Sequence, residues 1–297
     1  MTLETSSPLP APSSVPSAVQ DFSLGALERK AVAAQKRRSS VVIALRIAIF
    51  VIVVGAWELA ARIGWIDPFF FGKPSGVAQQ IYEWFVDGTS QGPLWKQMLV
   101  TMEETLLGFA IGSVAGVICG IALGRNRFLA DVFSVYIKIA NSIPRVVLGS
   151  IFIISLGLGM ASKVALAVVM VFFVVFANAF QGVREADRAM IANAQILGAS
   201  PWQLTTTVVI PSAMSWILAS LHVSFGFALV GAVVGEFLGS KQGIGLLIST
   251  AQGAFNANGV FAAMIILAVM ALAAEYLITW VENHIVRWRP EQLQDHN

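Results

Sequence analysis

Six long stretches of mostly apolar residues dominate the sequence. They cover residues 41–62, 100–123, 130–156, 164–183, 207–234 and 259–281. A helix needs roughly 20 such residues to cross the hydrocarbon core of a bilayer, where every backbone polar group must be paired within the segment. Hydrophobic residues make up 57% of the chain and charged residues 12%, which excludes a water-soluble globular domain. The sequence therefore predicts an all-α membrane protein with about six transmembrane helices.

The segments outside these stretches differ in composition. Residues 1–40 are rich in Ser, Pro and Ala and then in Arg and Lys, which predicts a disordered cytoplasmic tail and not a cleavable signal peptide. Residues 63–99 carry prolines and glycines between aromatic residues. We interpret them as an external segment, either lying partly in the membrane interface or forming a plain loop. Residues 100–285 form the core, and residues 286–297 a second cytoplasmic tail.

Lys and Arg residues near the ends of the apolar stretches predict the orientation. With the N-terminus inside, the outer side holds only Arg62, Lys73, Lys96, Lys163 and Lys241. The cytoplasmic side then holds a larger set: Arg29, Lys30, Lys36, Arg37, Arg38, Arg125, Arg127, Arg184, Arg188, Arg287 and Arg289. This excess predicts that both termini are cytoplasmic, which agrees with an even number of spans.

Glycine recurs at every fourth position of the second stretch, at Gly108, Gly112, Gly116, Gly120 and Gly124. Residues with this spacing lie on one face of a helix. Small residues allow the backbones of membrane helices to approach closely. We therefore expect a helix-packing face and not a contact with a solute.

The third stretch carries polar residues at helical spacing. Lys138, Asn141, Ser142 and Arg145 would share one helix face, which Pro144 interrupts. Charged groups at membrane depth usually face protein or water, so this face is a candidate lining for a translocation path in which Arg145 favours an anionic or polar solute. In the alternative interpretation, Lys138 extends to the interface and Arg145 pairs with a neighbouring acid. Glu236, after the fifth stretch, is a further candidate for the path.

The sequence offers no set of residues that predicts catalysis. The three histidines His222, His284 and His296 are scattered, and Cys119 has no partner cysteine. His222 is interpreted as a hydrogen-bond partner between helices. The glycine-rich segment 235–245 lacks the Gly-Lys-Ser/Thr ending of a phosphate loop. We expect no enzyme activity, metal, cofactor or nucleic-acid partner.

The loop at residues 184–206 is the only long charged loop on the side predicted to be cytoplasmic. Residues 189–197 are mostly good helix formers, Gly198 stands where a helix would end, and Pro201 allows another helix to begin. The sequence therefore predicts a compact helix, turn and helix that projects from the membrane. Such a shape suits a groove on another protein.

This loop resembles the loop of binding-protein-dependent ABC transporter permeases. The family pattern is Glu-Ala-Ala, three residues, Gly, nine residues, Ile, any residue, Leu-Pro. Gly198 matches the glycine and Pro211 the final proline, and the segments 197–200 and 202–204 are similar to the nitrate, sulfonate and taurine branch. Residues 141–145, 156–163 and 235–245 are also similar to that branch, so the resemblance covers roughly residues 100–285.

One position departs from the family pattern. Its Glu-Ala-Ala falls on Ala192, Asn193 and Ala194, so the acidic residue is missing. This puts a charge pair at that position in doubt but not the shape of the loop. The residues expected to contact an ATPase are Ala192, Asn193, Ala194, Leu197, Gly198, Ala199, Ser200, Pro201 and Pro211.

The resemblance implies the fold of a type I ABC importer permease in the bacterial inner membrane, surrounded by lipid. It further implies two permease subunits, as a homodimer, two separate ATPase subunits and an external solute-binding protein. The solute would be small and polar or anionic, of the nitrate, sulfonate or taurine kind, although the branch also carries pyrimidine precursors. The alternatives are a secondary transporter or channel without an ATPase, for which no internal repeat is seen, and a membrane-embedded enzyme.

Overall fold

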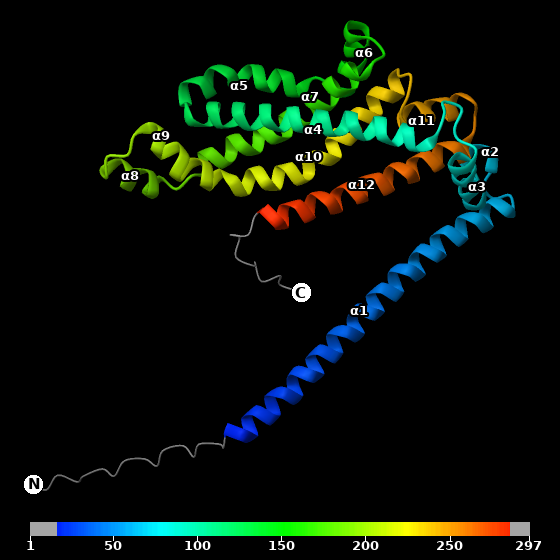
Figure 1. Ribbon diagram of the computed structural model, residues 1–297, viewed down its shortest axis with the longest axis horizontal. Coiled ribbons are helices and arrows are strands. Elements are labelled where there is room, and N and C mark those ends of the chain that lie inside the picture. The colour runs from blue at the N-terminus through cyan, green and yellow to red at the C-terminus, as the bar shows by residue number, and fades with distance from the viewer. Residues whose placement is uncertain (1–16, 286–297) are drawn as a thin grey trace, which may run out of the picture. The chain divides into compact units, whose positions relative to one another are not determined.

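The computed structural model describes residues 17–285 (Figure 1). Residues 1–16 of the predicted N-terminal tail (1–40) and the whole predicted C-terminal tail (286–297) lie outside the described residues. The described chain is helical with no named strand; its only β-pairing is an isolated bridge between Thr89 and Gly92. The prediction of an all-α protein is confirmed. The chain divides into two compact units, Met1–Arg62 and Ile63–Asn297, and each is described by itself.

The described part of the first unit is one helix, α1, over Ser17–Arg62. Its segment Arg37–Arg62 is long and apolar enough to span a membrane. The helix begins well before the predicted span at 41–62, so residues 17–40, expected in a disordered tail, are helical. The difference has a physical reason, because residues 26–38 consist almost entirely of Ala, Leu, Glu, Lys, Gln and Arg, which are strong helix formers. Near its end, Arg62 pairs with Glu58 at 2.7 Å.

The second unit contains the other helices. In chain order they are α2 (Pro68–Phe71), α3 (Pro74–Val86), α4 (Leu94–Arg125), α5 (Arg127–Ser142), α6 (Arg145–Leu156), α7 (Met160–Arg184), α8 (Arg188–Ile196), α9 (Pro201–Leu204), the π-helix η1 (Thr205–Val209), α10 (Ile210–Leu238), α11 (Ile244–Gly253) and α12 (Ala257–Ile285). With α1, five helical segments in the described residues can cross a membrane, and the bent pair α5 and α6 gives a sixth if it counts as one span. This agrees with about six spans.

The predicted third span is not one straight helix. α5 ends at Ser142 and α6 begins at Arg145, with a bend of 86° between the two. Lys138, Asn141 and Ser142 lie within α5 at helical spacing, but Arg145 belongs to α6, so the expectation that all four share one helix face is wrong. Pro144 causes the bend, because it has no N–H and forces the residue before it out of helical geometry; Ile143 is extended, with φ −74° and ψ 125°.

The segment at residues 63–99 is more ordered than its composition suggests. Pro68 and Pro74 occupy the first turns of α2 and α3, where a missing N–H does no harm. Asp67 caps α2 by accepting a hydrogen bond from the backbone N–H of Phe69 at 2.9 Å. α3 packs against α12, and α4 begins at Leu94, six residues before the predicted span. The prolines thus start helices here and do not break them.

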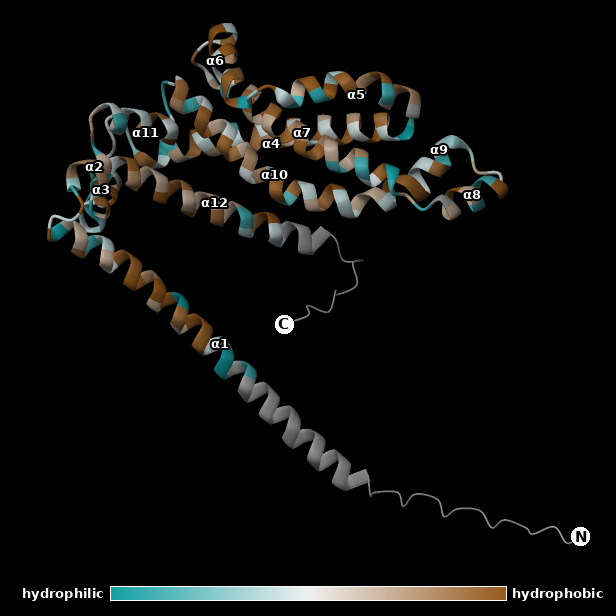
Figure 2. Cartoon of the chain, turned by 180° about the vertical axis from the view of Figure 1, so that it is seen from behind, coloured by the Kyte–Doolittle hydropathy of each residue, from teal (hydrophilic) through white to brown (hydrophobic). Residues whose placement is uncertain are grey.

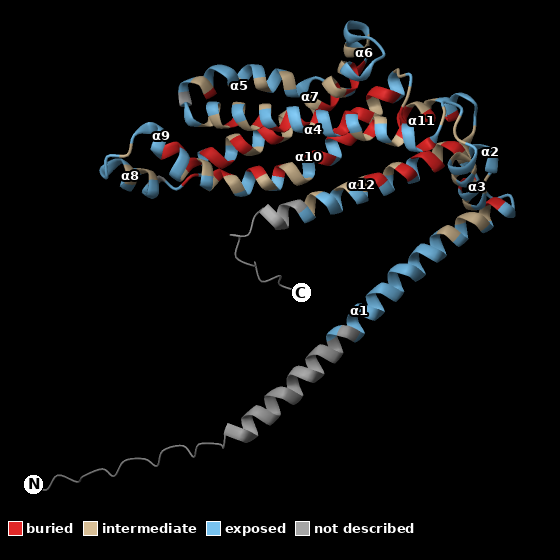
Figure 3. Ribbon diagram, in the orientation of Figure 1, coloured by how far each residue is buried: buried red, intermediate tan, exposed pale blue. Residues whose placement is uncertain are grey.

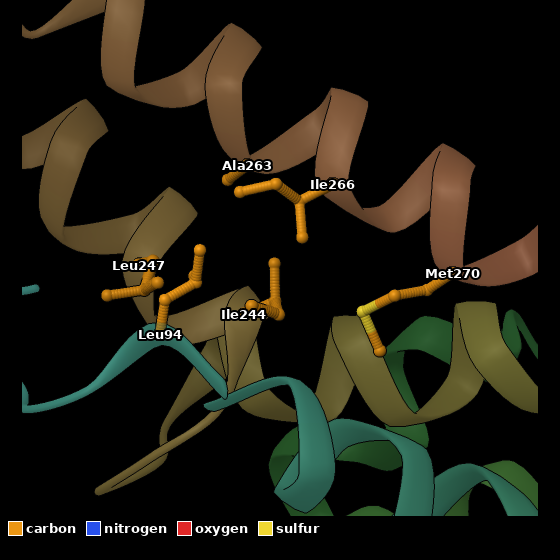
Figure 4. Close-up of a cluster of buried hydrophobic side chains, with 6 residues drawn as sticks. All are labelled: Leu94, Ile244, Leu247, Ala263, Ile266 and Met270. Atoms are coloured by element: carbon orange, nitrogen blue, oxygen red, sulfur yellow. The ribbon is translucent and has the colours of Figure 1, made fainter. Parts of the chain in front are cut away.

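The core of the second unit lies between α4, α7 and α10. Their facing sides are buried, whereas the outer sides carry exposed apolar residues, as expected of helices in lipid (Figures 2 and 3). A separate apolar cluster joins the start of α4 to α11 and α12 (Figure 4). It consists of Leu94, Ile244, Leu247, Ala263, Ile266 and Met270.

The glycines of α4 lie against α7. Gly108, Gly112, Gly116 and Gly120 are all buried. A methyl group added at Gly116 would lie 2.9 Å from Cβ of Val175 and 3.0 Å from the carbonyl oxygen of Phe172. A larger side chain at this position would therefore have to push the two backbones apart.

We expect Gly116→Leu to prevent stable packing of α4 on α7, at a cost of about 3 kcal/mol or more, because overpacking strains a close-packed interface. Thermal unfolding of the purified full chain in detergent measures the effect. Ala110→Leu, on the exposed side of the same helix, is the matched control and should unfold at the wild-type temperature. Equal unfolding temperatures for the two variants would contradict the packing role.

Candidate functional site

The loop between α7 and α10 folds through local capping interactions. Asp187 caps α8 by accepting a hydrogen bond from the N–H of Ala189 at 2.7 Å. α8 ends at Ile196, and the turn that follows contains Gly198, whose φ of +82° favours glycine. Ser200 and Gln203 then form a reciprocal capping box at the start of α9. The result is a helix, a tight turn and a second helix, held in shape by the loop's own side chains.

Large apolar side chains on this loop are exposed. The exposed fractions are 83% for Ile196, 86% for Leu197 and 70% for Trp202, and Met190 is also exposed. The loop lies at one end of the second unit, beyond the ends of α7 and α10 (Figure 1). Exposed apolar side chains gathered on a projecting element indicate an interaction surface. We call Met190, Ile196, Leu197 and Trp202 the loop surface.

The residues that the sequence analysis selected lie on or beside this surface. Ala192, Asn193, Gly198, Ser200, Pro201 and Pro211 are exposed, and Ala194 and Ala199 are half-buried. Ala192 therefore offers only a methyl group where the family pattern has a carboxylate. Sequence reasoning did not select Ile196 or Trp202, although large apolar residues in a charged loop are a signal that could have found them.

The loop is anchored to the transmembrane helices. Leu204, Thr205 and Val209 are buried, and the guanidinium of Arg125 at the end of α4 donates a hydrogen bond to the carbonyl oxygen of Pro201 at 3.4 Å. η1 joins α9 to α10 without an intervening loop. Because Pro211 has no N–H for the carbonyl four residues earlier, the regular helical ladder is interrupted next to this wider turn.

The bend between α5 and α6 places the side chains of Asn141 and Arg145 in contact. The guanidinium of Arg145 donates a hydrogen bond to Oδ1 of Asn141 at 3.0 Å and lies 5.3 Å from the ring centre of Phe173 on α7. Ser142 bonds instead to the carbonyl of Lys138 in its own helix. Asn141 and Ser142 are exposed and Arg145 is half-buried. Within the described residues no carboxylate pairs with Arg145, so this cation is positioned by neutral groups.

Glu236 occupies a different environment. Its side chain is fully buried. The hydroxyl of Thr101 donates a hydrogen bond to Oε1 and the N–H of Gly245 donates one to Oε2, each at 2.7 Å. The sequence analysis grouped Glu236 with the path residues, but here its carboxylate connects α10 to α4 and to the start of α11.

The sequence analysis did not predict the polar cluster around Glu236. Gln97, Thr101 and Glu104 of α4 and Lys163 of α7 are all buried beside it. Lys163, assigned above to the outer surface, is fully buried and donates hydrogen bonds to the carbonyls of Leu158 and Gly159. Two adjacent glutamates within the second apolar stretch were the available signal.

The remaining polar features are simpler. Nε2 of His222 on α10 lies 3.6 Å from Oε1 of Glu275 on α12, which agrees with its interpretation as a contact between helices. In the described part of the chain no group of three or more His, Cys, Asp or Glu side chains could hold a metal ion.

Comparisons with known proteins agree on one family. The sequence pattern of the family described as "Binding-protein-dependent transport system inner membrane component" matches residues 112–287. The riboflavin transport system permease protein RibX of Chloroflexus aurantiacus is 29% identical, over 78% of this chain and 85% of RibX. A putative aliphatic sulfonates transport permease protein, SsuC of Bacillus subtilis, is 26% identical, over 80% of this chain and 85% of SsuC.

A solved structure shares the fold. A chain of the MetNI methionine ABC transporter, in inward-facing conformations, superposes with a TM-score of 0.56 at 20% sequence identity. The match covers 65% of this chain and 94% of that chain. At this identity the likeness concerns the fold alone.

Proposed function

The chain belongs to the family of binding-protein-dependent transport system inner membrane components and is an ABC transporter permease, and from this premise we propose that a separate ATPase drives it by docking on the loop surface. The observation that carries the proposal is the projecting loop with Ile196, Leu197 and Trp202 exposed. Tryptophan is among the residues that most often dominate the binding energy of a protein interface, and neighbouring apolar side chains help to exclude water from it.

The chemistry of the loop surface suggests how the ATPase would bind. Ala192 replaces the acidic residue of the family pattern, so a charge pair at that position does not contribute. Burial of Leu197 and Trp202 in an apolar groove would supply a favourable contribution to binding instead, because apolar surface is removed from water. The expected ATPase groove is therefore lined by apolar side chains.

The anchoring of the loop suggests how movement would reach the membrane. α9 and η1 continue directly into α10, and buried Leu204 and Thr205 fix this junction. A displacement of the loop by the ATPase would therefore move α10 as a rigid body. Such a movement can drive transport if ATPase contact stabilises one of two packed arrangements of the helices over the other.

For the solute, we propose a small anionic or polar molecule such as a sulfonate, delivered by an external binding protein. Arg145 supports this proposal because its guanidinium has no carboxylate partner in the described residues and can pair with an anion. SsuC is named for aliphatic sulfonates and RibX for riboflavin. We further propose a homodimer of permeases in the inner membrane, with the loop and both termini in the cytoplasm.

We expect Arg145→Ala to raise the solute concentration for half-maximal uptake by roughly tenfold or more, because a charge-assisted hydrogen bond is lost. Uptake of a labelled alkanesulfonate into proteoliposomes that contain the ATPase and binding protein measures this. Lys96→Ala, which removes a positive charge from an exposed position of α4, is the control. An unchanged concentration dependence in Arg145→Ala would remove Arg145 from the path.

Purification of the tagged chain from its native membrane tests the function as a whole. Co-purification of a separately encoded ATPase, with solute uptake only when that ATPase and ATP are present, is the expected result. Uptake by the chain alone in liposomes would instead favour an ATPase-independent transporter or channel.

A further inference from the structure

The buried polar cluster is independent of the loop and of the candidate path. It lies where α4, α7 and α10 meet the start of α11. Its members are at most 2% exposed, among the most buried side chains in the described chain. They are Gln97, Thr101, Glu104, Lys163 and Glu236.

The cluster holds the glycine-rich segment 239–245. Oε1 of Gln97 accepts a hydrogen bond from the N–H of Gly243 at 2.7 Å, and Oγ1 of Thr101 accepts one from the N–H of Ile244 at 2.9 Å. Glu236 accepts the next N–H, that of Gly245. Successive N–H groups at the start of α11 are thus paired with side chains of α4 and α10. The approach is close, because a methyl group added at Gly245 would lie 2.6 Å from Cβ of Glu236.

Two carboxyl groups of the cluster have unequal surroundings. Both oxygens of Glu236 accept hydrogen bonds, from Thr101 and Gly245, so Glu236 has the partners that an ionised carboxylate requires. Oε2 of Glu104 is buried, and no donor among the described residues reaches it. Glu236 is the carboxyl group whose side chain interacts with that of Glu104. Two carboxylates can share such a contact only if one of them carries a proton.

The charge balance leads to the same conclusion. The charged groups near Glu104 are Glu236, Lys163 and Glu103, and of these Glu103 is exposed. Two ionised glutamates facing the single ammonium of Lys163 would leave an uncompensated negative charge among fully buried side chains. Such a charge is costly. One bound proton makes the cluster neutral.

We propose that Glu104 is a proton-binding site: its carboxyl group stays protonated and donates a hydrogen bond to ionised Glu236, which Lys163 balances. The bound proton ties α4 to α10 and so keeps Glu236 in place for the N–H of Gly245 at the start of α11. The site is separate from the ATPase contact and does not depend on the nature of the solute.

Substitution at Glu104 distinguishes a protonated from an ionised carboxyl group. Glutamine at this position keeps a donor for Glu236 and adds no charge, so Glu104→Gln should unfold within about 2 °C of wild type. Alanine leaves a cavity and no donor, so Glu104→Ala should unfold about 5 °C or more below wild type. Glu103→Gln, one residue away and exposed, is the control. The measurement is thermal unfolding of the full chain in lipid nanodiscs.

Infrared spectroscopy gives a second readout, and its decisive measurement is on the wild-type protein. Wild-type protein at neutral pH should show the C=O stretch of a protonated carboxyl group, shifted by ¹³C-labelled glutamate and absent from Glu104→Gln but present in Glu103→Gln. No such band in the labelled wild type would overturn the proposal. Equal destabilisation by Glu104→Gln and Glu104→Ala would also overturn it, since a donor would then not be what the site needs.

Discussion

Leu197→Asp is expected to reduce ATP-driven uptake to between about one thirtieth and one thousandth of the wild-type rate. Leu197 is 86% exposed at the tip of the loop, and in the proposed complex it enters an apolar groove of the ATPase. A carboxylate buried there without a partner loses the apolar contact and its own hydration, together about 2–4 kcal/mol. Leu197→Met, which conserves volume, should retain most of the activity.

The measurement for Leu197 is uptake into proteoliposomes together with ATPase binding to the purified chain. The chain itself should unfold at the same temperature as wild type, because Leu197 is exposed in the isolated permease. Wild-type uptake and ATPase binding by Leu197→Asp would show that the loop surface does not carry the contact. A lowered unfolding temperature would show that Leu197 acts in folding and not in docking.

Glu236→Leu is expected to destabilise the chain by about 3–5 kcal/mol, the typical cost of removing one partner from a buried charged network. The substitution leaves the N–H of Gly245 and the hydroxyl of Thr101 without their acceptor and leaves the Lys163 ammonium without its counter-charge. Thermal unfolding of the full chain in lipid nanodiscs measures the loss.

Glu103→Leu is the matched control for Glu236→Leu, because Glu103 is exposed on α4 and its replacement should change stability by less than about 0.5 kcal/mol. If Glu236→Leu unfolds at the same temperature as Glu103→Leu, the cluster does not hold α11 in place. The role in the translocation path that the sequence analysis suggested for Glu236 would then regain support.

The membrane helices could be predicted from the sequence because their signal is local. Long apolar runs and the four-residue glycine spacing depend only on neighbouring residues, so the spans that became α4, α7, α10 and α12 were found. The bend at Pro144 could have been placed more firmly, since proline restricts the residue before it. Pro68 and Pro74 led to the opposite error, because they were interpreted as breaks in the segment but begin α2 and α3. Whether a proline ends or starts a helix depends on where the preceding turn lies.

The buried cluster could not be predicted from the sequence because it is assembled from distant segments. Glu104, Lys163 and Glu236 come from three helices, and only the packing of α4, α7 and α10 brings them together. Lys163 follows Ser162 directly after a glycine-rich turn, and such a position usually indicates a solvated helix end. The loop was easier to predict, because Gly198, Ser200 and Pro201 determine their own turn through local backbone preferences and capping.

In the proposed complex, an ATPase subunit binds the loop around Gly198 on the cytoplasmic side of the membrane. The most direct measurement places a photo-crosslinking amino acid at Ala199 in intact cells and identifies the adduct by mass spectrometry. We predict an adduct with an ATP-hydrolysing subunit that forms with Ala199 and not with a probe at Trp65, which precedes α2. An Ala199 probe that captures no ATPase, or that a membrane-impermeant reagent labels from outside, would contradict the account.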